Sequence, residues 1–556
     1  MKKIFILVVL ILSTVDYVSG QFFDRQPEFT HQDTLRGTIT AERAWWDVTY
    51  YHLDMKVNLE DSTFSGTNTI RYKVDSTTTN VMQIDLQKPM EITKITQAGK
   101  ELPFGRDGNA FFAETSTNQK VGEINEVIIH FSGKPKKAIR APWDGGITWT
   151  RDKNGNPFVA SANQGIGASL WWPNKDHAYD EPDSMLMSIT VRDDLMNVSN
   201  GRLQKEVDNN DGTKTWYWFV SNPINNYGVN INIGDYTHFG QIYDGEKGEL
   251  DMDFYVLSYN LEKAMKQFAD APRTIEAFEH WFGPYPFYED SYKLVEAPYL
   301  GMEHQSSVTY GNGYENGYLG RDLSNTGWGL KFDFIIVHES GHEWFANNIT
   351  YKDVADMWIH ESFTNYAESL FLEYHFGKKA GKEYVLGTRL AIQNDRPIIG
   401  IYNVNYEGSS DMYSKGGNML HTIRQIIGDD ELWREILRGL NKQFFHQTVT
   451  TEQIENYIIE QSGKDLGSVF DQYLRDYRMP VLEYYFKDNK LVFRWNNAVS
   501  NFNMSVKVFV DGKEMILNPI TSWKAMPNSG KELEVDINYY VASFKIIVPL
   551  AFCRLI

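Results

Sequence analysis

The chain has a single cysteine, Cys553, among its 556 residues. One cysteine excludes a disulfide within the chain and a cysteine-based metal site, so any metal must be held by His, Asp or Glu. Basic residues are also in the minority, with 54 Lys and Arg against 73 Asp and Glu, which makes the formal net charge −19. Nucleic acid repels such a surface, so we expect no nucleic-acid partner.

Long apolar runs are absent except at the amino terminus. Lys2 and Lys3 precede an almost unbroken apolar run, Ile4–Leu12, and Val18-Ser19-Gly20 offers small or permissive residues for cleavage. This order predicts a signal peptide over residues 1–20, too short for a stable membrane span; a single membrane anchor is the alternative. We therefore expect export, and the lack of disulfides favours a periplasmic or secreted bacterial protein.

The length predicts several domains, and the pattern changes twice along the chain. Residues 21–240 are predicted to be β, because apolar Tyr51, Leu53 and Met55 alternate with polar neighbours. Turn clusters such as Gly105–Gly108 separate the expected strands.

The remaining chain divides into a longer and a shorter part. Residues 241–480 are predicted to be mostly helical from Lys331 onward, and Thr450 with Gln453 forms a capping box at one helix start. Residues 481–556 return to short alternating strands. The predicted fold class is multidomain α+β, with an N-terminal β domain, a helical domain and a short C-terminal β domain.

One predicted helix, Phe332–Asn348, contains the sequence His338-Glu339-Ser340-Gly341-His342. Residues four apart lie on one face of a helix, so both imidazoles can reach a single ion. Glu339 is displaced around the helix toward the open side of that ion, where it could serve as general base. Catalytic zinc typically takes three protein ligands and one water, so a third ligand must come from elsewhere.

The next predicted helix, an amphipathic segment over Val354–His375, offers Glu361 as that ligand. Glu368, seven residues further, shares the same face and could orient a ligand by hydrogen bonding. His360 and His375 stay open as alternative ligands, although His360 points to a different side of the helix from Glu361. A tyrosine would be a suitable donor to the developing oxyanion, but residue chemistry alone does not identify one.

This pattern resembles the zinc aminopeptidases that include aminopeptidase N and the leukotriene hydrolases. That family carries His-Glu-x-x-His, then eighteen residues, then a ligand Glu, and the same spacing separates His342 from Glu361 here. Trp358–Glu368 is similar to the family segment around the third ligand. The resemblance covers most of residues 40–480 and implies Glu339 as the catalytic base. The implied ligands of one Zn²⁺ ion are His338, His342 and Glu361.

Three further segments are similar to the family. Leu300-Gly301-Met302-Glu303-His304 resembles its Gly-x-Met-Glu-Asn strand, except that Leu300 and His304 depart from the motif. The resemblance implies that Gly301 and Met302 contact substrate and that Glu303 holds the free amino group, which a carboxylate does by pairing with ammonium. Gln164 aligns more loosely with a residue that contacts the same amine. Tyr413, in a segment similar to Tyr-x-Lys-Gly, would donate to the oxyanion.

The resemblance implies an N-terminal β saddle, a thermolysin-like catalytic domain and hydrolysis of the first peptide bond of peptides with a free amino terminus. Better-known members continue into a large helical domain, whereas residues 481–556 are predicted to be strands, so we expect a more open active site. The alternatives are a zinc endopeptidase or other zinc hydrolase, and a non-catalytic secreted binding protein, which would need neither Glu339 nor Tyr413. The sequence indicates no particular oligomeric state.

Overall fold

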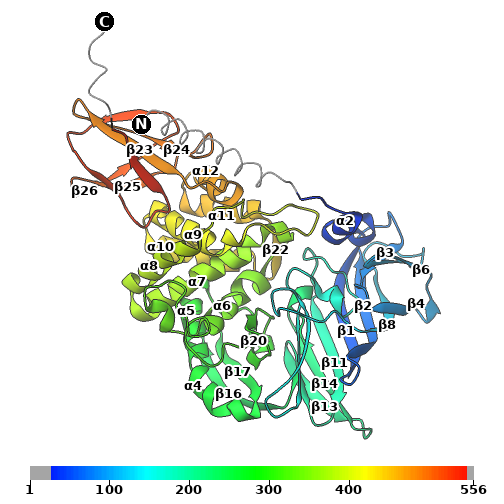
Figure 1. The fold of residues 1–556 in the computed structure, drawn as a ribbon. Helices are drawn as coiled ribbons and strands as arrows, with labels where there is room; N and C mark the ends of the chain where they lie inside the picture. Colours follow the sequence, from blue (N-terminus) through cyan, green and yellow to red (C-terminus); the bar gives the residue numbers. More distant parts are fainter. Residues whose placement is uncertain (1–26, 548–556) are drawn as a thin grey trace, which may run out of the picture.

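The computed structural model describes residues 27–547 (Figure 1). The predicted signal peptide and Cys553 lie outside the described residues. Within residues 27–547, none of the helices is long and apolar enough to cross a membrane. Figure 1 shows a β-rich N-terminal domain in blue to cyan, a helical domain in green to yellow and small orange-to-red sheets at the carboxyl end.

An eight-stranded sheet with the order β13-β14-β11-β1-β2-β8-β4-β5 dominates the N-terminal domain. Its strands pair antiparallel except β1 with β11. Tyr51, Leu53 and Met55 on β1 are buried, which confirms the predicted alternation. The strands are β1 (Trp46–Asn58), β2 (Thr63–Val74), β4 (Glu91–Gln97), β5 (Lys100–Glu101), β8 (Ile124–Gly133), β11 (Ser184–Arg192), β13 (Arg202–Asp208) and β14 (Thr213–Val220).

Within residues 27–240, two smaller sheets and two short α-helices complete this domain. The predicted turn at Gly105–Gly108 was wrong in its extent, because Gly105 to Asp107 belong to β6 and the chain turns at Gly108, whose φ is 60°. The elements are α2 (His31–Gly37), α3 (Ala41–Ala44), β3 (Val81–Asp85), β6 (Phe104–Asp107), β7 (Ala110–Glu114), β9 (Gly146–Arg151), β10 (Pro157–Ala162), β12 (Met196–Val198) and β15 (Asn232–Gly234).

A five-stranded sheet with the order β16-β17-β18-β20-β19 begins the next region, and β19 is its edge strand. The short β19 carries Gly301 and Met302, and Glu303 follows it directly. The strands are β16 (Tyr236–Gly245), β17 (Gly248–Leu257), β18 (Tyr292–Glu296), β19 (Gly301–Met302) and β20 (Val308–Tyr310).

The helical region differs from the sequence prediction at two boundaries. The helix predicted over Phe332–Asn348 ends as an α-helix at Gly341, and the helix predicted from Val354 begins at Trp358 after a short 3₁₀ turn. The capping box at Thr450 and Gln453 is confirmed. The elements are α4 (Leu261–Gln267), α5 (Asp270–Phe282), α6 (Phe334–Gly341), β21 (Ile349–Tyr351), α7 (Trp358–Phe376), α8 (Lys378–Gly387), α9 (Ser414–Ile427), α10 (Asp430–Gln443), β22 (Gln447–Val449), α11 (Thr451–Ser462) and α12 (Gly467–Phe470).

Helix α7 is a core helix rather than the amphipathic helix that the sequence predicted. Every residue from Trp358 to Leu372 is buried. Helices α5, α6, α8 and α9 all contact it, so no side of its first four turns faces solvent. Because polar groups are expensive to bury without partners, the polar side chains on α7 must be satisfied within the protein.

The C-terminal strands form a four-stranded and a three-stranded sheet. Val506, Val508 and Val510 are buried, as their alternation predicted. Leu482 and Trp495 belong to the same hydrophobic cluster as residues of α6 and α7, so these sheets pack directly on the helical domain. The strands are β23 (Val481–Lys487), β24 (Lys490–Asn496), β25 (Val506–Val510), β26 (Lys513–Leu517), β27 (Lys524–Pro527), β28 (Leu533–Val535) and β29 (Ala542–Lys545).

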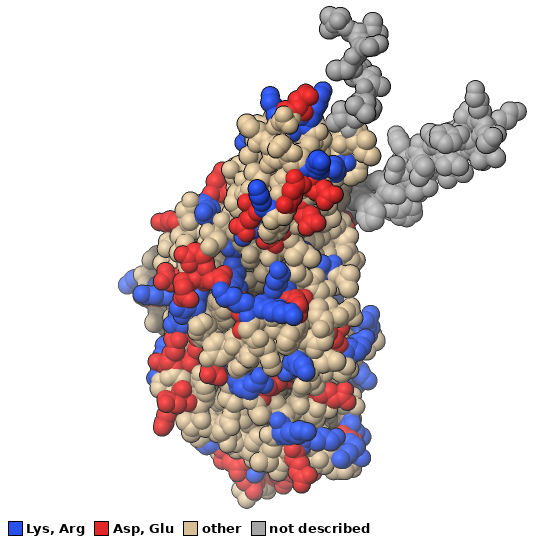
Figure 2. Space-filling view, turned by 90° about the vertical axis from the view of Figure 1, so that its left-hand side faces the viewer, with Lys and Arg blue, Asp and Glu red and all other residues tan. Residues whose placement is uncertain are grey.

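The acidic excess is not gathered in one place on the face that Figure 2 shows. Lys and Arg side chains are interspersed with Asp and Glu side chains across this face. The net charge of −19 therefore does not produce an extended single-sign patch there.

Candidate metal centre and substrate cleft

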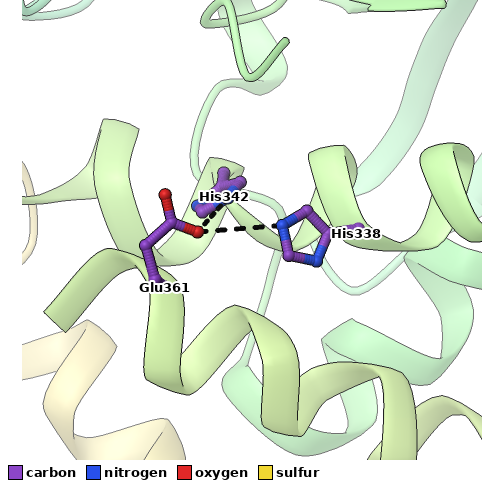
Figure 3. Close-up of side chains that lie close together, drawn as sticks. All are labelled: His338, His342 and Glu361. Carbon is purple, nitrogen blue, oxygen red and sulfur yellow. Dashed lines mark ion pairs between the residues drawn. The ribbon is translucent and has the colours of Figure 1, made fainter. Parts of the chain in front are cut away.

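Three of the predicted site residues converge between α6 and α7 (Figure 3). His338 lies on α6, His342 is the residue that ends this helix, and Glu361 lies in the first turn of α7. Oε2 of Glu361 is 3.8 Å from Nε2 of His338 and 3.4 Å from Nε2 of His342. Ligand atoms of all three residues lie within 4.8 Å of one another, and all three residues are buried. We call this group the metal cluster.

The irregular backbone that follows α6 orients His342. Phe345 and Ala346 leave helical φ and ψ values, which ends the continuous helix that the sequence predicted. Nδ1 of His342 lies 3.0 Å from the Phe345 carbonyl oxygen and 3.1 Å from the Thr364 hydroxyl. A carbonyl can only accept, so Nδ1 carries the hydrogen and Nε2 presents its lone pair toward Glu361.

His338 is oriented by a buried carboxylate, as the spacing to Glu368 predicted. Nδ1 of His338 donates to Oε1 of Glu368 over 2.8 Å. The Tyr384 hydroxyl donates to the other oxygen of Glu368 over 2.6 Å, and the Asn365 amide contacts Oε1 at 3.3 Å. Such a hydrogen-bonded carboxylate sets the tautomer of a metal-binding histidine and raises its basicity.

The two alternative histidines lie outside the metal cluster. Nε2 of His360 accepts a hydrogen bond from the Tyr351 backbone N–H at 2.8 Å, and its Nδ1 is 3.2 Å from the Tyr227 hydroxyl. His375 instead meets the Arg273 carbonyl, 3.0 Å away. Both histidines therefore contact protein groups away from the metal cluster, and Glu361 is the α7 side chain that lies close to Nε2 of both His338 and His342.

The metal cluster fits a zinc ion by its chemistry and its spacing. Oε2 of Glu361 is buried and has no hydrogen-bond partner among the described residues. Burial alone would raise the pKa of Glu361, but the two imidazoles outweigh it and hold this pKa well below its usual range. Two imidazole nitrogens and a carboxylate oxygen are a common catalytic zinc donor set, and zinc bonds of about 2.0–2.1 Å suit atoms separated by these distances.

Glu339 projects into a cavity of about 360 Å³ beside the metal cluster. Burial raises the pKa of Glu339, although His338 and His342 act in the opposite direction. A Cβ atom at Gly301 would lie 3.0 Å from Oε1 of Glu339 and 2.7 Å from a methyl of Ile335. A side chain at position 301 would therefore displace the Glu339 carboxylate. Glycine at this position leaves room for that carboxylate beside the metal cluster.

Two polar side chains from different domains, Gln164 and Glu303, meet next to the metal cluster, and we call them the amine cluster. Gln164 follows β10 of the N-terminal domain, and its amide donates to Oε1 of Glu303 at 2.7 Å and to Oε1 of Glu361 at 3.0 Å. Asn347 donates to the Glu303 carbonyl at 3.0 Å. Burial raises the pKa of Glu303 to about 7, with His342 opposing and Glu339 adding to the rise. Met302 lines the same cavity.

Tyr413 reaches the cavity from the start of α9. Its ring centroid is 6.2 Å from that of His338. Burial, reinforced by the carboxylates of Glu361 and Glu303, raises the pKa of Tyr413 well above 10. The phenol therefore keeps its hydrogen at neutral pH and can act as a hydrogen-bond donor.

Comparison with known proteins identifies the family of this chain. Residues 48–227 match the peptidase M1 N-terminal domain, and residues 267–473 match the peptidase family M1 domain. This chain belongs to the peptidase M1 family. The predicted multidomain α+β fold class, with an N-terminal β domain, a mostly helical catalytic domain and C-terminal sheets, is confirmed.

Two curated relatives illustrate the sequence similarity. This chain is 28% identical to aminopeptidase N of Lactococcus lactis over 298 aligned residues. The alignment covers 48% of this chain and 32% of the relative. The chain is 22% identical over 454 residues to probable aminopeptidase 1 of Sulfurisphaera tokodaii, covering 77% of this chain and 53% of the relative. The chain thus spans about half the length, or less, of these relatives.

Solved structures share the fold at lower identity. An M1 zinc metallopeptidase variant from Deinococcus radiodurans, bound to a Tyr-Ser-Ala substrate, aligns with a TM-score of 0.65 at 18% identity, covering 78% of this chain and 95% of that one. A two-domain M1 zinc metallopeptidase variant bound to L-tryptophan aligns with a TM-score of 0.67 at 18% identity, covering 80% and 96%.

Several side chains around the M1 site were missed by sequence reasoning. Phe334 stacks on the His338 ring with centroids 5.1 Å apart, and its place four residues before His338 on one helix was a usable signal. Tyr318 contacts Phe334 and also lines the cavity. Tyr384 and Trp143 come from distant segments, and no local pattern connects them to the site.

Proposed function

We propose that this M1 chain is a zinc-dependent aminopeptidase that hydrolyses the N-terminal peptide bond of peptides. The supporting observation is the position of Glu303, whose carboxylate lies in one group with Glu339 and His342, all ligand atoms within 4.8 Å. A buried carboxylate pairs strongly with the ammonium of a free amino terminus. That anchor would set a short fixed distance to the metal cluster, so that only the first peptide carbonyl reaches it.

The residues of the cleft have complementary roles in this proposal. His338, His342 and Glu361 would hold one Zn²⁺ ion, which when bound supplies Lewis acidity and lowers the pKa of water. Glu339 takes the proton from the attacking water and passes it to the leaving amine. Tyr413 donates its hydroxyl hydrogen to the carbonyl oxygen as negative charge develops there. Glu303, assisted by Gln164, holds the substrate ammonium.

Glu339→Gln tests the role of the base. The amide cannot accept the proton from water, so we expect kcat to fall by about 10²–10⁴-fold or more while zinc content is unchanged. Hydrolysis of aminoacyl fluorogenic substrates and metal analysis of the purified protein measure the two quantities. Normal turnover by the variant would exclude Glu339 as the base.

A substrate panel separates the aminopeptidase from its alternatives. We expect hydrolysis of peptides with a free amino terminus, loss of activity with a chelator and recovery on adding zinc. Equal cleavage of N-acetylated peptides would favour an endopeptidase. Bound zinc without turnover of any aminoacyl substrate would favour a non-catalytic binding protein.

We also propose that the protein is exported and works in the periplasm or outside the cell. The support is the amino-terminal sequence, in which two lysines precede the apolar run. Amino-terminal sequencing of protein from the periplasmic or extracellular fraction should begin at Gln21. Intact protein that begins at Met1 in the cytosolic fraction would contradict export.

A further inference from the structure

An exposed tryptophan from the N-terminal domain stands at the rim of the cleft. Trp143 is 64% exposed, yet it lines the same cavity as Glu303 and Met302. It lies on a short connection, residues 139–145, which we call the rim loop. Large exposed aromatic side chains beside a cavity are typical of ligand contacts, because they offer a broad apolar surface with few rotatable bonds.

Hydrogen bonds within the rim loop hold it in shape. The Asp144 carboxylate accepts the backbone N–H groups of Ile139 and Arg140 at 2.7 and 2.9 Å. The Lys136 ammonium donates to the Asp144 carbonyl at 2.9 Å, and the Gly145 N–H donates to the Pro142 carbonyl at 3.0 Å. Trp143 sits between Pro142 and Asp144, so its backbone position is set by these bonds.

The contacts of the rim loop place Trp143 on the side of the amine cluster. A Cβ atom at Gly145 would lie 2.2 Å from Cγ2 of Ile166, so the loop packs closely on the segment that carries Gln164. Ala141 packs against the small hydrophobic cluster that contains Tyr299 and Met302. The rim loop therefore packs against the segments that carry Gln164 and Met302, and Trp143 lines the same cavity as Glu303 and Gln164.

We propose that Trp143 is a specificity-determining residue that forms one wall of the pocket for the first side chain of the substrate. This inference rests on the proposed aminopeptidase function. Leu300 and Pro142 also line the cavity, and Leu300 adds an apolar side chain where the family motif has glycine. The enzyme therefore prefers peptides that begin with a large apolar or aromatic residue.

The remaining lining supports the same substrate class. Among the described residues that line this cavity there is no lysine, arginine or aspartate. Its charged side chains all belong to the metal cluster, to the amine cluster or to Glu339. A charged first side chain would therefore find no uncommitted partner there, whereas an apolar one would be shielded from water by the indole.

Trp143→Ala tests this assignment with three aminoacyl fluorogenic substrates that begin with Phe, Leu or Ala. We expect kcat/KM to fall by about tenfold to a hundredfold for Phe and Leu, and by less than about threefold for Ala. Trp143→Phe should keep most of the preference. Ile139→Ala is the matched control, because Ile139 lies on the same loop, is 88% exposed and is not among the cavity-lining residues.

A second readout needs no turnover. Calorimetry with the zinc-loaded protein should show tighter binding of free L-phenylalanine than of L-alanine, and Trp143→Ala should remove most of this difference. The same preference in the variant, or no preference in the wild type, would overturn the role of Trp143. If the wild type shows the Trp143-dependent binding preference but hydrolyses no substrate, the aminopeptidase proposal is wrong and the role of Trp143 in binding still holds.

Discussion

The metal cluster and the amine cluster share one cleft but are built from the chain in different ways. His338, His342 and Glu361 come from two successive elements, α6 and α7. Gln164 and Glu303 are 139 residues apart and come from different domains. The first cluster therefore forms from one stretch of chain, whereas the second exists only where the N-terminal domain packs against the catalytic domain.

The contacts that support the two histidines of the metal cluster are also local. His338 is held by Glu368, and His342 by the Phe345 carbonyl and Thr364, all within 30 residues along the chain. The Gln164 amide of the other domain donates to Glu303 and also to Oε1 of Glu361, so the metal cluster has one contact across the domain boundary. Because the supports of the two histidines are local, metal binding should be less sensitive to changes between the domains than recognition of the amino terminus.

Glu361→Ala should have the largest effect, because it removes a ligand of the metal cluster. It leaves two imidazoles without a third ligand, so we expect loss of stoichiometric zinc and a fall of at least about 10⁴-fold in kcat/KM. Metal analysis after gel filtration and a fluorogenic assay measure both. Glu452→Ala, at an exposed glutamate on α11, is the control. Full zinc content in Glu361→Ala would remove Glu361 from the metal cluster.

Glu303→Ala should have a smaller effect on activity, because it changes the amine cluster and leaves the ligands of the metal cluster in place. The variant keeps all three proposed zinc ligands, so its zinc content should not change. Loss of the carboxylate removes the ammonium partner, and we expect the preference for free over N-acetylated substrates to fall by about tenfold or more. Parallel assays of the two substrate types give this ratio. An unchanged preference would place the amine elsewhere.

Tyr384→Phe should have the smallest effect, and it tests the hydrogen bonds that support the metal cluster. It removes one hydrogen bond to Glu368, which in turn orients His338. We expect zinc affinity to fall by about tenfold, with the preference for free amino termini unchanged. Competition with a zinc-binding dye measures the affinity. A change in substrate preference without a change in zinc affinity would contradict this role.

Sequence reasoning succeeded where the determining geometry is local. Strand alternation at Tyr51 to Met55 and the capping box at Thr450 depend on neighbours within a few residues. The same reasoning failed at the end of α6, where a continuous helix was predicted. There the chain leaves helical geometry at Phe345 and turns a carbonyl toward His342, and the intrinsic helix pattern does not encode this contact.

The sequence by itself determined the order of the β and helical regions, because the period of the apolar pattern changes along the chain. It also determined that His338 and His342 can bind one metal ion, because one helical turn brings them to one face. The resemblance to a known family already assigned Gln164 and Glu303 to the same substrate amine, but only the tertiary structure decided that the Gln164 amide donates to the Glu303 carboxylate and that Trp143 borders the same cavity. These contacts join segments more than a hundred residues apart. They arise from the packing of whole domains, and no local periodicity records them.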